Sequence, residues 1–138
     1  MMTEYDDQGN IITKGEYIEG KRNGEWYFRM GGTEVDGTYS DDMRNGLWQY
    51  WDIASSREKD KVLRFEGRYV EDNPHGEHTY YWDNGNKREQ GQYVMGLKEG
   101  NWEYYNYDGT PFLVVSYENG IEKKYDGVKI EQNLAGTE

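Results

Sequence analysis

Polar and apolar residues alternate along most of this chain. Gly15 and Tyr17 fall on one face of an extended segment, and Trp26 and Phe28 fall on one face of the next. This two-residue period is typical of β-strands, because successive side chains of a strand point to opposite faces. No segment shows the 3.6-residue period of an amphipathic helix. The pattern therefore predicts an all-β fold made of short strands.

The alternating segments belong to a unit that recurs along the chain. Each unit has Gly-x-Tyr, a second glycine nine residues after the first, and a tryptophan two residues further on. These positions are Gly15, Tyr17, Gly24 and Trp26; Gly37, Tyr39, Gly46 and Trp48; Gly67, Tyr69 and Gly76, with His78 in place of the tryptophan; and Gly91, Tyr93, Gly100 and Trp102. The first glycines give periods of 22, 30 and 24 residues. Periods of this length indicate an array of supersecondary units, so we interpret these residues as structural.

Turn signals separate the predicted strands. Asn84-Gly85 and Asp108-Gly109 are strong hairpin signals, and glycine also ends the turns at Gly20 and Gly96. Asp42 and Asp72 replace that glycine in the second and third units, and aspartate tolerates a positive φ better than most residues. With hairpin following hairpin, the sequence predicts one elongated, single-layer antiparallel β meander of about nine or ten strands.

The repeat also predicts how the chain is divided. We expect a single domain over residues 1–130, with units that start near positions 15, 37, 67, 91 and 115, a partial N-terminal cap at 5–14, and a flexible tail at 131–138. Residues 52–61 lengthen the second unit. They are interpreted as a tolerated polar hairpin tip, with a partner-contacting loop as the alternative.

Composition narrows the choice of partners. The chain has 27 acidic and 16 basic residues, and its net charge of −11 disfavours direct binding to nucleic acid or anionic lipid. We therefore expect a protein partner, and a basic or nucleic-acid-binding one fits the charge. The chain contains no cysteine, and no apolar leader or 18-residue apolar run was found, which favours a cytoplasmic location.

Chemistry-bearing groups give little support for an enzyme. His75 and His78 are three residues apart on a predicted strand, so they point to opposite faces, and each fills a position of the repeat. Acidic pairs such as Asp41-Asp42 lack the spacing of a calcium loop, and no serine lies in a nucleophile motif. We predict no enzymatic activity, no metal site and no cofactor.

Aromatic columns are the stronger signal. The tyrosine, tryptophan and Phe28/Tyr50/Tyr80/Tyr104 columns predict the apolar face of the sheet. A further column follows the last of these by one residue and should face the other way, so it is either packing between strands or a contact site. The candidate protein-binding residues are this column and the acidic turn residues: Trp51, Tyr81, Tyr105, Asp41, Asp42, Glu71 and Asp72.

The fourth unit, Gly91-Gln92-Tyr93-Val94-Met95-Gly96-Leu97-Lys98-Glu99-Gly100-Asn101-Trp102-Glu103-Tyr104-Tyr105, resembles the MORN-repeat variant of bacterial proteins. The resemblance covers roughly positions 5–127, with departures at Asp42, Asp72, His78 and in the longer second unit. It implies an extended antiparallel β meander. It also implies an antitoxin-like or protein-interaction role, with phospholipid binding and dimerisation known for other MORN proteins.

Several functions follow from these features. The first is a non-enzymatic protein-binding module, antitoxin-like or inhibitory. The second is an acidic nucleic-acid mimic that blocks the basic groove of a nucleic-acid enzyme, as a phage or plasmid inhibitor would. The third is phospholipid binding through the turn cations Lys21, Arg22, Arg44 and Lys98, against which the net charge argues. Open sheet edges would also permit self-association.

Overall fold

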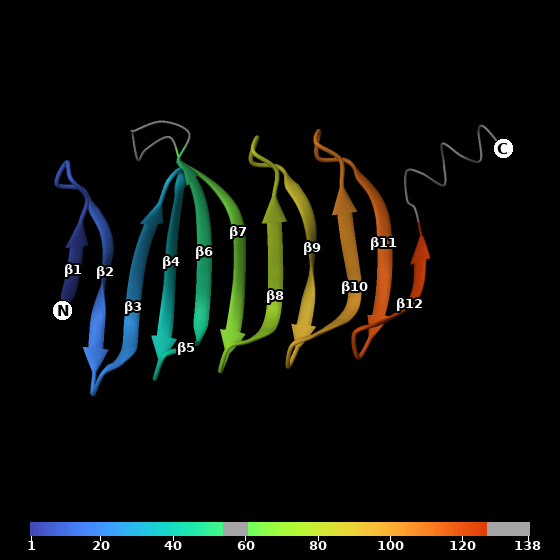
Figure 1. The fold of residues 1–138 in the computed structure, drawn as a ribbon. Helices are drawn as coiled ribbons and strands as arrows, with labels where there is room; N and C mark the ends of the chain where they lie inside the picture. Colours follow the sequence, from blue (N-terminus) through green and yellow to red (C-terminus); the bar gives the residue numbers. More distant parts are fainter. Residues whose placement is uncertain (54–60, 127–138) are drawn as a thin grey trace.

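The computed structural model describes residues 1–53 and 61–126, which form one open antiparallel β-sheet without a helix (Figure 1). Eleven strands follow one another across the sheet in chain order, and the short strand β5 pairs with β4 beside that path. The predicted all-β, single-layer antiparallel meander is confirmed. Residues 54–60 and 127–138 lie outside the described part, and with them most of the long second-unit loop and the whole expected tail.

The strands are β1 (Met2–Tyr5), β2 (Ile11–Ile18), β3 (Lys21–Met30), β4 (Thr33–Ser40), β5 (Met43–Arg44), β6 (Gly46–Ile53), β7 (Lys61–Val70), β8 (Asn73–Tyr81), β9 (Lys87–Val94), β10 (Leu97–Tyr105), β11 (Pro111–Glu118) and β12 (Ile121–Asp126).

The twelve described strands exceed the nine or ten that the sequence predicted. One reason is the chain ends, because β1 begins at Met2 and β12 continues to Asp126. The other is a break within the second unit. There the backbone N–H of Asn45 donates to the Thr38 carbonyl oxygen at 2.9 Å, and Gly46 adopts a φ of 89°, so that β5 and β6 are separate strands.

Five two-residue turns lie at one end of the strands, at the bottom of the sheet in Figure 1. Both central residues of each turn have positive φ, the type I′ conformation that matches the twist of the flanking strands. Asp42 and Asp72, at φ 69° and 70°, adopt the conformation that glycine adopts in the other three turns. Successive turns are joined, because the second turn residue donates its N–H to a carbonyl of the preceding hairpin, as Gly120 does to Lys98 at 2.8 Å.

The first glycine of each unit is the floor of an aromatic slot. A Cβ on Gly15, Gly37 or Gly91 would overlap the indole of Trp26, Trp48 or Trp102. Each indole N–H donates to the carbonyl of the residue after that glycine, over 3.0–3.2 Å. The three indoles are at most 3 % exposed. The glycine-tryptophan spacing therefore encodes a large ring lying flat on the neighbouring strand.

His78 occupies the same slot in the third unit. Its Nε2 lies 2.8 Å from the Arg68 carbonyl oxygen, so Nε2 carries the proton and donates as the indoles do. Burial lowers the pKa of His78, which keeps the imidazole neutral. The smaller ring leaves space above Gly67 that the Phe65 ring fills, at a centroid distance of 5.4 Å from His78.

The second glycine of each unit has a different role. Gly24, Gly46, Gly76 and Gly100 all have positive φ, and Gly24, Gly76 and Gly100 lie where the pairing of β3, β8 and β10 with the preceding strand shifts register. These glycines permit a local irregularity in the second strand of each unit, just before the slot aromatic.

The rings on one face form a continuous row. Neighbours in it have centroid distances of 4.8–6.5 Å and mostly edge-to-face geometry. Its members are Tyr17, Trp26, Tyr39, Trp48, Tyr69, His78, Tyr93 and Trp102. The buried cluster Val35, Trp48 and Phe65 lies on this face, which we call the aromatic face.

The opposite surface, which we call the polar face, carries a row of side chains that are register partners from strand to strand. This polar row is Lys14, Tyr27, Asp36, Gln49, Glu66, Thr79, Gln90 and Glu103. It crosses the sheet from β2 to β10 at right angles to the strands. The hydrogen bonds from Gln49 to Glu66 at 2.8 Å and from Gln90 to Thr79 at 3.2 Å follow it.

Candidate functional site

The candidate aromatics Trp51, Tyr81 and Tyr105 lie on β6, β8 and β10. Each follows an aromatic-face residue by one position, so strand alternation places it on the polar face. Because one strand separates each from the next, neighbours in this column are about 10 Å apart. All three side chains are half-buried. The structure thus arranges them as a spaced band and not as a single cluster.

Carboxylates surround this band. Burial raises the pKa of Tyr81, and the nearby Glu66 and Glu77 raise it further. Burial also raises the pKa of Tyr105, whose hydroxyl donates to Glu103 Oε1 at 3.1 Å. Aromatic and acidic side chains therefore occur together on the polar face.

Sequence analysis did not select these acids as site residues. The signal was available, because Glu103 is two residues from Tyr105 and Glu77 is four residues from Tyr81, which places each acid on the same face as its tyrosine.

The acidic turn residues lie elsewhere, in the type I′ turns at one end of the strands. Asp42 Oδ1 accepts hydrogen bonds from the backbone N–H and the Nε of Arg22, at 2.8 and 2.9 Å. Asp72 is bound in the same way by Arg44, at 2.7 and 3.2 Å. The backbone donors are the main reason that the pKa values of both aspartates are lowered.

The other two acidic candidates, Asp41 and Glu71, are exposed at the same turns. Asp42 and Asp72 link successive turns through their hydrogen bonds with Arg22 and Arg44. None of the four acidic candidates lies beside the band of Trp51, Tyr81 and Tyr105.

The turn cations considered for lipid binding are largely engaged. Arg22 lies over the Tyr39 ring at 4.1 Å and Arg44 over the Tyr69 ring at 4.2 Å, in addition to their ion pairs. Lys98 lies over Trp102 at 4.5 Å. No helix among the described residues has the length and apolar character needed to cross a bilayer.

The two histidines are held apart in separate structural roles. His75 Nδ1 accepts the backbone N–H of Met95 at 3.1 Å, as Asn23 Oδ1 accepts that of Asp41 at 3.0 Å. His78 lies in the aromatic slot. Within residues 1–53 and 61–126, no group of three or more His, Cys, Asp or Glu side chains is arranged to hold a metal ion.

The polar face also contains a buried carboxylate that sequence analysis missed. Glu34 is only 2 % exposed, accepts a hydrogen bond from Tyr27 Oη at 2.7 Å, and lies 3.4 Å from Lys61 Nζ. Lys61 lies in turn over the Trp51 ring at 4.6 Å. Two residues further along β4, Asp36 faces the same side. Burial is the main cause that raises the pKa of Asp36, and Lys61 opposes it.

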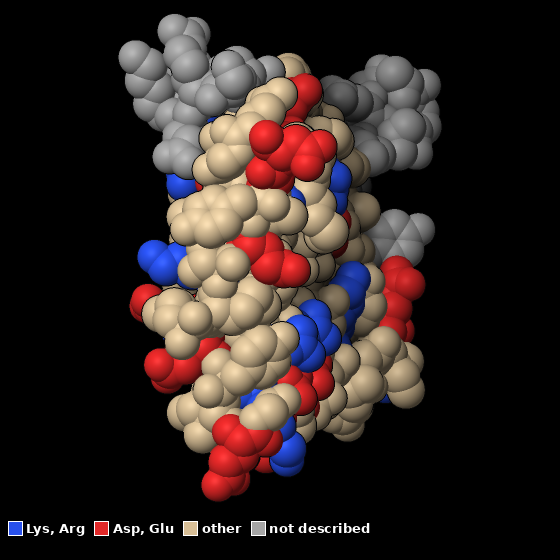
Figure 2. Space-filling model, turned by 60° about the vertical axis from the view of Figure 1, so that its left-hand side comes forward, with Lys and Arg blue, Asp and Glu red and all other residues tan. Residues whose placement is uncertain are grey.

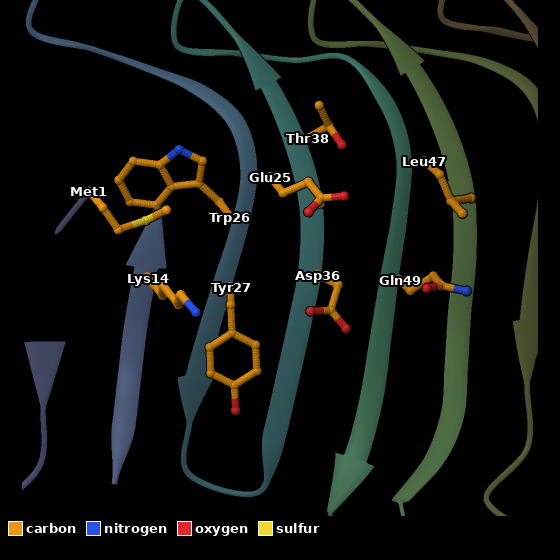
Figure 3. A pocket seen from close by; sticks show the side chains of 10 residues that line it. Met1, Lys14, Glu25, Trp26, Tyr27, Asp36, Thr38, Leu47 and Gln49 are labelled. Carbon is orange, nitrogen blue, oxygen red and sulfur yellow. The ribbon is translucent and has the colours of Figure 1, made fainter. Parts of the chain in front are cut away.

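Beside this cluster the polar face is hollowed into a trough of about 580 Å³. Figure 3 shows Lys14, Tyr27, Asp36 and Gln49 side by side across β2, β3, β4 and β6, with Glu25 above them. Carboxylates are spread over the side of the molecule seen in Figure 2, with lysine and arginine side chains between them. The trough contains charged hydrogen-bonding groups of both signs, namely the acids Glu25 and Asp36 and the base Lys14.

Comparison with known proteins adds no identification, because no family model matches the chain and no curated protein is detectably similar to it.

Proposed function

We propose that this protein is a non-enzymatic protein-binding repeat module of the MORN-like class, and that its polar face is the binding surface. The observation that carries the proposal is the aromatic and acidic band formed by Trp51, Tyr81 and Tyr105 with Glu66, Glu77 and Glu103. Tyrosine and tryptophan rings are enriched at protein interfaces, and the carboxylates beside them here complement a partner that presents cationic and apolar groups.

The division of labour between the faces supports this choice. Rings on the aromatic face contact one another along the whole row and so stabilise the sheet. The band on the polar face does not repeat in the same way, since Trp51 contacts Lys61 whereas Tyr105 contacts Glu103. An inhibitory or antitoxin-like module requires a surface that is specific to one partner, and such a surface cannot be fully repetitive.

Affinity capture from the native host tests the proposal. The wild-type chain should retain one stoichiometric partner, identified by mass spectrometry and then purified for a binding titration. Replacing Trp51, Tyr81 and Tyr105 by alanine should weaken that complex by at least about a hundredfold, as expected when interface aromatics are lost.

Tyr107→Ala is the matched control, because it removes an exposed ring from the turn between β10 and β11 and should leave affinity unchanged. Equal binding of the triple variant and the wild type would reject the polar-face assignment. Failure of the wild type to capture any stoichiometric partner would reject the module itself.

The net charge of −11 keeps a second candidate open, namely an acidic mimic that occupies the basic groove of a nucleic-acid enzyme. In that case the triple variant keeps its partner, the complex dissociates between about 50 and 200 mM salt, and duplex DNA or RNA competes for the partner. Phospholipid binding is less favoured because Arg22, Arg44 and Lys98 are already bound to rings or carboxylates. It would appear as co-sedimentation with anionic vesicles.

A further inference from the structure

The β3–β4 hairpin, which contributes Tyr27 and Asp36 to the trough, differs from four other hairpins of the sheet. In the hairpins β1–β2, β6–β7, β8–β9 and β10–β11, the register shifts by one residue near the turn end, so that one residue of the second strand is extra. The β3–β4 hairpin is paired without any shift through Met30 and Thr33. Its turn has only two residues, Gly31 and Gly32.

The regular register of the β3–β4 hairpin determines the face of the sheet to which the acidic side chains of β4 point. In β9 the extra residue is Arg88, whose guanidinium lies over the Tyr80 ring on the aromatic face. In β4 the pairing is regular, so Glu34 and Asp36 both point to the polar face, opposite the buried Val35. Two carboxylates are therefore brought to one side of one strand, and of the two only Asp36 lines the trough.

These two carboxylates are not equally neutralised. Glu34 is paired with Lys61 and accepts the Tyr27 hydroxyl. Asp36 is also partly desolvated, yet no ion pair to it is formed within the described residues. The indole N–H of Trp51, on the neighbouring strand, is buried and has no hydrogen-bond partner among those residues. A partly desolvated carboxylate without an ion pair, such as that of Asp36, is strongly stabilised by a cation that a binding partner supplies.

We propose that the trough binds a lysine or arginine side chain on an extended segment of the partner protein, with Asp36 and Glu25 as the anionic contacts. The inference rests on the proposed function and specifies its site. Gln49 and Thr38 offer hydrogen bonds to the segment's backbone, and Lys14 offers a cation to a carbonyl or carboxylate one position away. The Tyr27 ring beside Asp36 suits the aliphatic part of the incoming side chain.

Short peptides can test the site without knowledge of the partner. The probes are the capped pentapeptides Gly-Ser-Arg-Ser-Gly, Gly-Ser-Lys-Ser-Gly and Gly-Ser-Glu-Ser-Gly, titrated into the full-length ¹⁵N-labelled chain at 50 mM salt. We expect the two cationic peptides to shift the amide signals of residues 14, 25–27, 36–38 and 49, and the acidic peptide to shift none of them. Shifts scattered over the acidic surface, or equal shifts with the acidic peptide, would overturn the proposal.

Two matched variants separate a binding role from a structural one. Asp36→Asn should weaken binding of the arginine peptide by at least about tenfold, whereas Asp7→Asn, an exposed acid in the N-terminal turn, should not. Asp36→Asn should also keep or raise the thermal midpoint at pH 7, because it removes a partly desolvated charge. Loss of binding with a lower midpoint would indicate a structural residue instead.

The purified partner distinguishes this inference from the proposed function. If the partner binds wild type and Asp36→Asn equally but does not bind the triple-alanine variant, the proposed function is supported and the trough is not the binding site. If Asp36→Asn loses the partner while the triple variant keeps it, the trough stands and the aromatic band is not the contact. Retention by both variants rejects both assignments.

Discussion

The two faces of the sheet obey different rules. On the aromatic face, every full unit repeats the same construction, in which a ring lies on glycine and its N–H reaches the next carbonyl. On the polar face, equivalent positions hold Tyr27, Gln49, Thr79 and Glu103, which differ in size, charge and hydrogen-bonding partner. Repetition thus marks what the fold requires, and variation marks the surface that the repeat leaves free to differ from unit to unit.

The largest expected effect is on the aromatic face. Trp102→Ala removes a side chain with 0 % exposure and should lower the free energy of unfolding by about 3–5 kcal/mol, measured by chemical denaturation. Gly91→Ala should also be strongly destabilising, because its Cβ would overlap the indole. In the Trp102→Ala background the glycine substitution should cost far less, since the overlap is gone.

Gly32→Ala is the control for these variants, because the nearest atom to its Cβ would be 3.8 Å away and its φ is not in the left-handed region. Additive effects of Gly91→Ala and Trp102→Ala would show that the slot is not the unit of stability that the aromatic face implies.

The exception in the third unit allows a finer test. His78→Trp restores the residue of the other units, but Phe65 occupies the space that the indole would need. We expect the single substitution to destabilise the protein by about 1–3 kcal/mol through overpacking. The double variant Phe65→Val with His78→Trp should recover most of the loss, because the second unit already combines Val35 with Trp48.

A double-mutant cycle measures this compensation. Zero coupling between positions 65 and 78 would mean that the histidine is tolerated for a reason other than the phenylalanine beside it.

The sequence alone predicted what the repeat encodes locally. Residue spacing within one unit was sufficient for the meander, the hairpin turns and the two glycine columns, because each depends on neighbours within one hairpin. The burial of Glu34 was not predictable in this way, since it depends on Tyr27 and on Lys61 from a strand 27 residues away.

The turn aspartates show the same limit. The sequence makes Asp42 and Asp72 contact candidates, and the structure adds that each is hydrogen-bonded by an arginine, 20 and 28 residues away respectively. Stacking of successive turns, which no single unit encodes, brings these partners together.

These aspartates give the third prediction, on pH. Hydrogen bonds from Arg22 and Arg44 hold their pKa values below the ordinary value of an aspartate, so each contributes stability that is complete above about pH 4 and is lost as pH falls through the lowered pKa. Asp42→Asn with Asp72→Asn should therefore reduce the thermal midpoint at pH 7 by less than either slot variant, and this difference from wild type should shrink below pH 4.

A pair of the same substitutions at Asp7 and Asp41, which are exposed, serves as the comparison. If that pair lowers the midpoint at pH 7 equally, the contacts with Arg22 and Arg44 are not the cause.

The smallest expected effect on stability is on the polar face. Glu77 and Glu103 are exposed, and Glu77→Gln or Glu103→Gln should change the free energy of unfolding by no more than about 0.5 kcal/mol each. The same substitutions should weaken binding to the purified partner and reduce its salt dependence, because each removes one charge from the aromatic and acidic band. Destabilisation of the size seen for the slot variants would mean that the polar face is constrained by folding as the aromatic face is, and the contrast between the faces would then fail.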